Sequence, residues 1–180
     1  MGNTNDEITP DLAAWIARQR VFFVATAPLA VDGLVNCSPK GLDTLRVLGP
    51  RAVAYLDLTG SGIETVAHLR ENGRIVLMFC AFEGPPKIVR LHGRGTVLTR
   101  NDPTFADLRP ALGPERPGER SIVHVEVTRV SDSCGFGVPR YEFAGDREQL
   151  TKWAHAKGEA WLVEYRAAKN ATSVEGLRGL

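Results

Sequence analysis

The chain has 180 residues, of which 43% are hydrophobic and 24% charged, as in a globular protein that buries one core without disulfide or metal cross-links. Its formal net charge of +1 gives no electrostatic reason to expect nucleic acid or an anionic membrane as a partner. No apolar run approaches the roughly 20 residues of a membrane-spanning helix. The polar, acidic start is unlike a secretory signal, so we expect a cytoplasmic protein.

The first third of the chain predicts one short helix followed by closely spaced strands. Thr9 is a capping hydroxyl and Pro10 suits the first helical position, so we expect a helix over 9–20. Beyond it, apolar and β-branched runs alternate with proline and glycine, which is typical of strands joined by turns. These strands are expected at 21–26, 34–38, 45–48 and 52–57.

The segment TGSGIETVAHLREN at 59–72 turns from a strand into a helix, expected over 62–72 and ended by Gly73. Ser61 and Glu64 have the spacing of a capping box. Small residues and free N–H groups at the positive end of a helix dipole suit an anion, above all a phosphate. The simpler interpretation is a helix cap alone, because capping boxes are common and Glu64 brings a competing negative charge.

The remaining elements predict a mainly β protein with flanking helices, of the α+β class. Strands are expected at 74–82, 88–98 and 121–130, and glycines at 93 and 95 indicate a bulge or a sharp barrel bend. The strands lie too close together for crossover helices between all of them, so the sheet should be antiparallel and closed. We expect a single domain over 1–180, with the barrel over 21–130 and a helical tail over 146–180.

Neither the three cysteines nor the four histidines have metal-ligand spacing, so no metal site is expected. Cys37 and Cys80 lie in apolar strand-like runs, where reduced, buried thiols are expected. His68 should be a solvated or capped side chain unless it contacts a ligand, and His92 a satisfied strand residue. No Ser-His-Asp or Cys-His arrangement can be assembled, so nothing supports nucleophilic catalysis.

Five short motifs follow one another in a particular order. They are NCSPKG at 36–41, YLD at 55–57, TGSGIETVAH at 59–68, FCAF at 79–82 and RLHGRG at 90–95. This succession resembles the pyridoxamine 5′-phosphate oxidase-like family of FMN-binding split β-barrels. The resemblance covers residues 12–145, and residues 134–180 look like a marker of a subfamily.

The resemblance implies an antiparallel split β-barrel, FMN as cofactor, and a homodimer with two flavin sites at the subunit interface. The family holds the flavin phosphate on the strand after the first turn and on the strand-to-helix connection. It also places contacts beside the flavin-binding strand and on the strand after the proline turn, and the tail is a candidate to cover the flavin from the partner subunit. Carried over by position, the cofactor-binding residues are Asn36, Ser38, Lys40, Tyr55, Asp57, Thr59, Ser61, Thr65, Arg90 and Trp153.

Two departures from the family pattern narrow the expected function. Glu64 or Thr65 stands where the family usually has a basic residue, so Lys40 and Arg90 would have to balance the phosphate charge. The segment EGLRGL at 175–180 replaces the arginine- and histidine-rich ending that grips the substrate of B6 oxidases, so pyridoxamine phosphate oxidation is not expected.

We therefore expect an FMN-dependent oxidoreductase that transfers hydride or electrons between flavin and an unidentified small molecule. A second possibility is a module that holds FMN, a deazaflavin or haem without turnover. A third is a structural dimer without a ligand.

Overall fold

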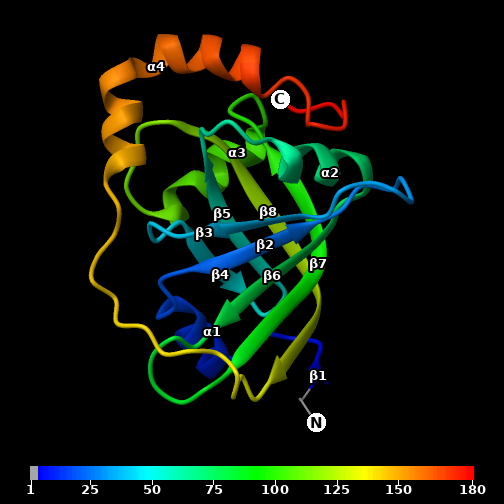
Figure 1. Ribbon diagram of the computed structural model, residues 1–180, viewed down its shortest axis with the longest axis vertical. Coiled ribbons are helices and arrows are strands. Elements are labelled where there is room, and N and C mark those ends of the chain that lie inside the picture. The colour runs from blue at the N-terminus through cyan, green and yellow to red at the C-terminus, as the bar shows by residue number, and fades with distance from the viewer. Residues whose placement is uncertain (1–3) are drawn as a thin grey trace.

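The computed structural model describes residues 4–180, which form one antiparallel sheet wrapped into a split β-barrel with helices on its outside (Figure 1). The strands follow the order β3-β2-β6-β7-β8-β5-β4, with β1 added beside β8. The mainly β, antiparallel split-barrel prediction is confirmed, and residues 1–3 of the predicted domain lie outside the described residues. The strands are β1 (Thr4–Asn5), β2 (Phe22–Thr26), β3 (Asn36–Lys40), β4 (Leu45–Gly49), β5 (Ala52–Leu58), β6 (Arg74–Cys80), β7 (Ile88–Leu98) and β8 (Glu119–Ser133).

Every second side chain of β2 enters the barrel core, as the alternation of its residues predicts. Phe22 lies edge-on to Tyr55, with ring centroids 5.4 Å apart, and stacks on Phe79 at 5.9 Å. β3 begins two residues later than predicted and includes Pro39, which an edge strand tolerates because one side needs no ladder hydrogen bond.

Helix α1 (Pro10–Ala17) packs at the lower end of the barrel in Figure 1. The predicted Thr9 cap is confirmed, since its hydroxyl accepts a hydrogen bond from the Leu12 nitrogen at 3.3 Å. The helix ends at Ala17 rather than at residue 20. Ile16 anchors it, with 2% of its surface exposed.

The predicted irregularity at Gly93 is confirmed, since the register of β7 against β8 shifts between His92 and Gly93. A Cβ atom at Gly93 would lie 2.2 Å from the carbonyl oxygen of Glu126, far inside van der Waals contact. The close approach of the two strands therefore requires glycine here.

Helix α2 (Glu64–Asn72) connects β5 to β6, and Gly73 ends it in the left-handed region with φ 69°. The predicted capping box is wrong. Ile63 is the N-cap residue and makes no side-chain cap hydrogen bond, and Ser61 lies outside the helix. Glu64 instead accepts from the Val174 nitrogen at 3.4 Å, so a segment distant in the sequence takes the carboxylate that would have closed the cap.

The second half of the chain adds α3 (Pro103–Leu108), the 3-10 helix η1 (Arg109–Leu112) and α4 (Gln149–Lys169). Helix α4 is kinked at Gly158, whose φ of 74° and ψ of 160° are not helical. Figure 1 shows α4 arching over one side of the barrel, joined to β8 by a long extended segment. The chain then folds back over 170–180 against the start of α2.

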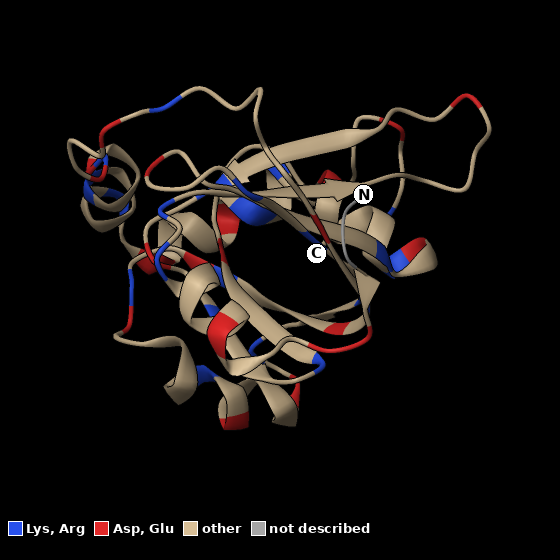
Figure 2. Cartoon of the chain, turned by 90° about the horizontal axis from the view of Figure 1, so that it is seen from below, with Lys and Arg blue, Asp and Glu red and all other residues tan. Residues whose placement is uncertain are grey.

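Charged residues in Figure 2 are scattered over helices, loops and strand ends rather than gathered on one side, in keeping with the net charge of +1. Within residues 4–180, none of the helices combines the length and apolar character needed to cross a membrane.

Candidate functional site

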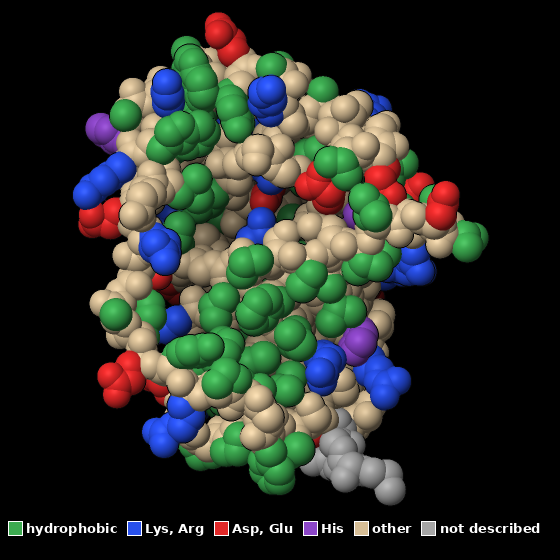
Figure 3. Space-filling model, in the orientation of Figure 1, with side chains coloured by type: hydrophobic (Ala, Val, Ile, Leu, Met, Phe, Trp, Pro, Cys, Tyr) green, Lys and Arg blue, Asp and Glu red, His purple; other side chains and the backbone are tan. Residues whose placement is uncertain are grey.

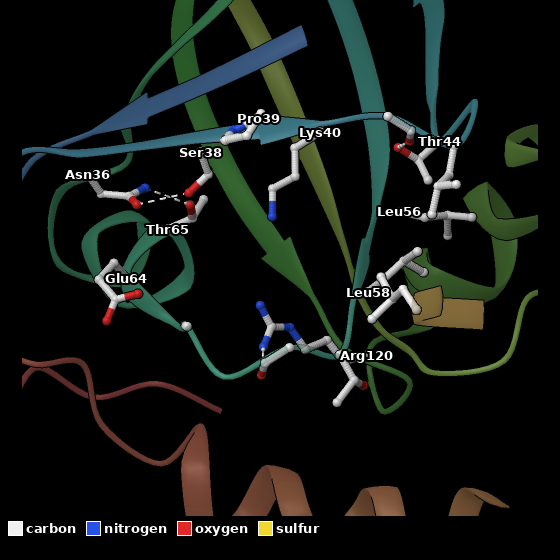
Figure 4. A pocket seen from close by; sticks show the side chains of 16 residues that line it. Asn36, Ser38, Pro39, Lys40, Thr44, Leu56, Leu58, Glu64, Thr65 and Arg120 are labelled. Atoms are coloured by element: carbon white, nitrogen blue, oxygen red, sulfur yellow. Dashed lines mark hydrogen bonds between the residues drawn. The ribbon is translucent and has the colours of Figure 1, made fainter. Parts of the chain in front are cut away.

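A pocket of about 460 Å³ lies between the edge strand β3, the end of β5 and the beginning of α2 (Figure 4). Its walls bring together segments that are distant in the sequence: the strand at 36–41, the turn at 58–62 and one arginine from β8. Helix α4 contributes Leu150. Polar side chains from three elements line it, namely Asn36, Ser38, Lys40, Thr44, Thr59, Glu64, Thr65 and Arg120.

Two cations of the pocket converge on the buried carboxylate of Asp57. Arg120 Nε lies 2.6 Å from Asp57 Oδ2, and Lys40 Nζ lies 3.5 Å from Asp57 Oδ1. Burial alone would raise the pKa of Asp57, but the charges of Arg120 and Lys40, with hydrogen bonds from Arg120 and Ser121, outweigh it and hold the pKa below its ordinary value. Asp57 is therefore ionised and fixes both cations at the pocket wall.

Arg120 was missed by the sequence analysis, which began the last strand at Ser121. The register pairs Ser121 with Asp57, so Arg120 enters β8 beside the strand end that carries the carboxylate. A buried aspartate needs a cation or several hydrogen bonds, and an arginine at the start of the partner strand could have indicated the pair.

The C-terminal tail fixes the glycine-rich turn of the pocket. Asn170, fully buried, accepts from Arg120 Nη1 at 2.9 Å and donates to the carbonyl oxygens of Gly60 at 3.0 Å and Ser61 at 3.3 Å. Thr59 donates its hydroxyl hydrogen to the Gly118 carbonyl at 2.8 Å. The turn is therefore held in place on both sides before any ligand arrives.

A second polar group lies opposite the cations. Asn36 donates to the Thr65 hydroxyl at 2.9 Å and accepts from the Ser38 hydroxyl at 3.0 Å, as the dashed lines of Figure 4 show. Lys40 and Arg120 point into the space between this group and the end of β5. Ser38, Thr44 and Thr59 give their hydroxyl hydrogens to other groups of the protein, whereas Thr65 accepts from Asn36. The pocket thus offers two positive charges and the Thr65 hydroxyl in a small volume, which is chemistry that can recognise a phosphate.

Similarity to known proteins identifies the family of this chain. A model of the family described as pyridoxamine 5′-phosphate oxidase matches residues 8–134, more than half of the chain. The chain belongs to this family. The pyridoxamine 5′-phosphate oxidase family protein ustO of Aspergillus flavus is 39% identical over 193 aligned residues, covering 97% of this chain and 76% of that protein.

Solved structures support the fold assigned to this member of the pyridoxamine 5′-phosphate oxidase family. A variant of HupZ from Group A Streptococcus superposes with a TM-score of 0.53 at 21% identity, over 70% of this chain and 99% of that one. A candidate pyridoxamine 5′-phosphate oxidase from Lactobacillus delbrueckii gives 0.52 at 19% identity, over 70% and 94%. At these identities the likeness shows the fold alone.

The structure brings some of the residues carried over from the family to the pocket and leaves others elsewhere. Asn36, Ser38, Lys40, Thr59 and Thr65 line it, and Asp57 lies directly behind its cations. Their roles toward a cofactor stay predictions.

The other residues that the family resemblance suggested are not among those that line this pocket. Ser61 is exposed. Tyr55 is buried in the core, where burial and then the Asp57 charge raise its pKa well above the ordinary value. Arg90, on β7, donates to the hydroxyl of Ser133, on β8, at 3.2 Å. Trp153 packs edge-on against Trp161, with centroids 5.7 Å apart.

Two predictions about single side chains are wrong. Cys37 is exposed, because it points to the outer face of the edge strand, whereas Cys80 is buried as expected. His68 is fully buried rather than solvated, with Nδ1 3.0 Å from the Thr26 hydroxyl and Nε2 3.3 Å from Glu175. Within residues 4–180, no group of three or more His, Cys, Asp and Glu side chains could hold a metal ion.

Proposed function

We propose that this chain is an FMN-dependent oxidoreductase that transfers hydride or electrons between the flavin and a small molecule. The observation that carries the proposal is the convergence of Lys40 and Arg120 on buried Asp57 at a pocket lined by hydroxyls, in a member of the pyridoxamine 5′-phosphate oxidase family.

The residues present fit a phosphate monoester. Lys40 and Arg120 carry two positive charges, and Asp57 and Glu64 carry two negative charges, so the group has no net charge. The phosphate assignment therefore depends on the position of the two cations at the pocket wall, with Asp57 behind them. The Thr65 hydroxyl and the turn at Gly60 and Gly62 add hydrogen-bonding groups, and 460 Å³ falls within the usual size of cofactor pockets. Glu64 also lines the pocket, but its Oε1 accepts from Val174 in the tail.

A bound flavin would supply the hydride or electron transfer. Lys40 and Arg120 would hold its phosphate, and Thr65 would orient it by donating its hydroxyl hydrogen. Leu58 and Leu150 would exclude water from the pocket wall. The lining residues include neither histidine nor cysteine, so proton transfer or covalent catalysis by those side chains at this pocket is not part of the proposal.

We further propose a homodimer with the flavin sites at its interface. The outer face of the sheet pairs Phe23 with Met78 and Ala25 with Val76 across β2 and β6, and all four side chains are only partly buried. Figure 3 shows hydrophobic side chains gathered over this part of the sheet. An apolar face of this kind is typical of an interface with another subunit.

The experiment that tests the flavin proposal is purification of the protein, followed by its absorption spectrum and a mass spectrum of any ligand released on denaturation. We expect a yellow protein that releases FMN. A colourless protein that takes up no added FMN would contradict the proposal. Release of a deazaflavin or haem would show that this molecule, and not FMN, is the cofactor. Reduction by NADH or NADPH followed by reoxidation with an acceptor would separate an oxidoreductase from a module that only holds flavin.

The phosphate assignment predicts that Lys40→Ala weakens FMN binding by about tenfold, because a charge-assisted contact is lost. Lys40 is the better target than Arg120, whose removal would leave Asp57 buried without its closest cation. Lys87→Ala removes the same charge from the β6–β7 turn, away from the pocket lining, and serves as the matched control. Equal FMN affinity in both variants, measured by fluorescence titration, would contradict this phosphate site.

A further inference from the structure

A chain of hydrogen bonds links the C-terminal tail to the pocket through the buried imidazole of His68. Glu175 Oε2 lies 3.3 Å from His68 Nε2, and His68 Nδ1 lies 3.0 Å from the Thr26 hydroxyl. The imidazole has no exposed surface, so Glu175 and Thr26 are the groups that set which ring nitrogen carries the hydrogen.

The chain continues from Thr26 into the polar group of the pocket. Asn36 Nδ2 donates to Thr26 Oγ1 at 3.1 Å and to Thr65 Oγ1 at 2.9 Å. Ser38 donates to Asn36 Oδ1 at 3.0 Å. Figure 4 shows the last part of this chain on the pocket wall, on the side opposite Arg120. The Asn36 side-chain amide therefore connects the buried His68, through Thr26, to the hydroxyls of Thr65 and Ser38 in the pocket.

Glu175 determines which partner donates and which accepts in each hydrogen bond of this series. Its Oε1 accepts from the Leu34 nitrogen at 2.7 Å, and its Oε2 faces His68 Nε2. A carboxylate can only accept, so Nε2 must carry a hydrogen and the lone pair of a neutral ring lies on Nδ1. Thr26 then gives its single hydroxyl hydrogen to Nδ1, and its oxygen can only accept from Asn36.

The orientation of the Asn36 amide follows from this direction. Both hydrogens of Nδ2 are used by Thr26 and Thr65, and Oδ1 is left for Ser38. Because the Thr65 oxygen accepts from Asn36, the hydrogen of the Thr65 hydroxyl remains available to the pocket. Thr65 then faces an anion as a donor.

We propose that Glu175 and His68 are positioning residues, which hold His68 as the neutral Nε2–H tautomer and thereby keep Thr65 a hydrogen-bond donor toward the phosphate of the cofactor. This inference rests on the proposed flavin function, since it assigns the phosphate as the acceptor. Neither residue lines the pocket; both act through Thr26 and Asn36.

The substitution Glu175→Gln reverses the chain with little change of shape. The Leu34 nitrogen still needs an acceptor, so the new amide oxygen stays there and the amide nitrogen faces His68. The imidazole then accepts at Nε2 and carries its hydrogen on Nδ1, where it donates to Thr26. Thr26 donates onward to Asn36, the amide turns over, and the Thr65 hydrogen is drawn to the amide oxygen and lost to the pocket. The amide nitrogen then donates to Ser38 and releases the Ser38 hydrogen, so the hydroxyl donor moves from Thr65 on α2 to Ser38 on β3.

The test combines two measurements on full-length protein. Nitrogen-15 NMR of the ligand-free protein reports the His68 tautomer, which we expect to be Nε2–H in the wild type and Nδ1–H in Glu175→Gln. Titration with FMN should show binding weaker by up to about tenfold in Glu175→Gln, because the hydrogen bond at the Thr65 position is lost when the hydroxyl donor moves to Ser38. Glu71→Gln is the matched control. Glu71, on α2, accepts from the Leu29 nitrogen at 2.8 Å and so holds the same loop as Glu175, but it takes no part in the hydrogen bonds that lead to Asn36.

The outcomes separate this inference from the flavin proposal. An imidazolium or Nδ1–H form in the wild type, or an unchanged tautomer in Glu175→Gln, would overturn the inference whether or not FMN binds. A switched tautomer with unchanged FMN affinity would overturn it while leaving the flavin function intact. Equal weakening in Glu71→Gln would assign the effect to the loop and also overturn it. Absence of FMN binding in the wild type would instead reject the flavin function, and with it the cofactor that the inference serves.

Discussion

Asp57 organises the electrostatics of the site at the scale of a single residue. It is buried, its pKa lies below the ordinary value, and it holds both Arg120 and Lys40. A carboxyl whose pKa is lower in the folded than in the unfolded state stabilises the fold above the unfolded-state pKa, and this stabilisation is lost as the pH falls through the folded-state pKa. For Asp57 the loss begins below the ordinary value of 3.8.

We therefore predict that Asp57→Asn lowers the free energy of unfolding by about 3–5 kcal/mol near pH 7, because Arg120 is left buried without its charge partner. The difference from the wild type should narrow as the pH falls below about 4, where the carboxyl of the unfolded wild type is protonated, and should vanish only below the lower pKa of the folded state. Urea unfolding at a series of pH values measures both effects. Asp43→Asn removes an exposed ion pair with Arg46 and should cost less than about 1 kcal/mol. A difference that stays constant into acid would contradict the assignment.

At the scale of elements, the β7–β8 pair depends on the absence of one side chain. Gly93→Ala would place a Cβ 2.2 Å from the Glu126 carbonyl oxygen, and because that atom belongs to the backbone, the two strands must separate. We predict destabilisation of about 3 kcal/mol, measured as a shift of the urea midpoint. Gly49→Ala in β4 meets nothing within 4 Å and should be nearly neutral. A neutral Gly93→Ala would show that the strands can part freely at the bulge.

Local patterns predicted the elements that depend on local physics. Apolar and β-branched runs located β2 and β5, apolar–polar alternation located β7, Thr9 capped α1, and Gly73 ended α2. The beginning of α2 could not be predicted in this way, because its Glu64 and His68 bind the tail, more than 100 residues further along the chain. Local spacing carries no information about such a partner.

The same limit applies to the candidate site. Motif order placed Ser38, Lys40 and Thr65 on one pocket, because the strand and the strand-to-helix turn that carry them are recognisable in sequence. The residues around Asn170 give no indication of the site, and Arg120 can be recognised only once its strand is paired with the strand that carries Asp57. They reach the site through the pairing of β8 with β5 and through the return of the tail, which only the folded chain defines.

At the scale of the whole molecule, the apolar outer face around Phe23 should be covered by a second copy of the chain. We predict that the protein behaves in light scattering as a dimer of about twice the chain mass of 19.6 kDa. Phe23→Glu would place like charges on both subunits at this face, since the proposed twofold interface repeats every residue, and should give the monomer mass and weaker FMN retention. Val31→Glu adds the same charge at a fully exposed loop position and should leave the dimer intact.

A monomeric wild type, or a dimer that survives Phe23→Glu, would place the subunit contact elsewhere or remove it. A Phe23→Glu monomer that retains FMN with wild-type affinity would show instead that a single subunit completes the flavin site.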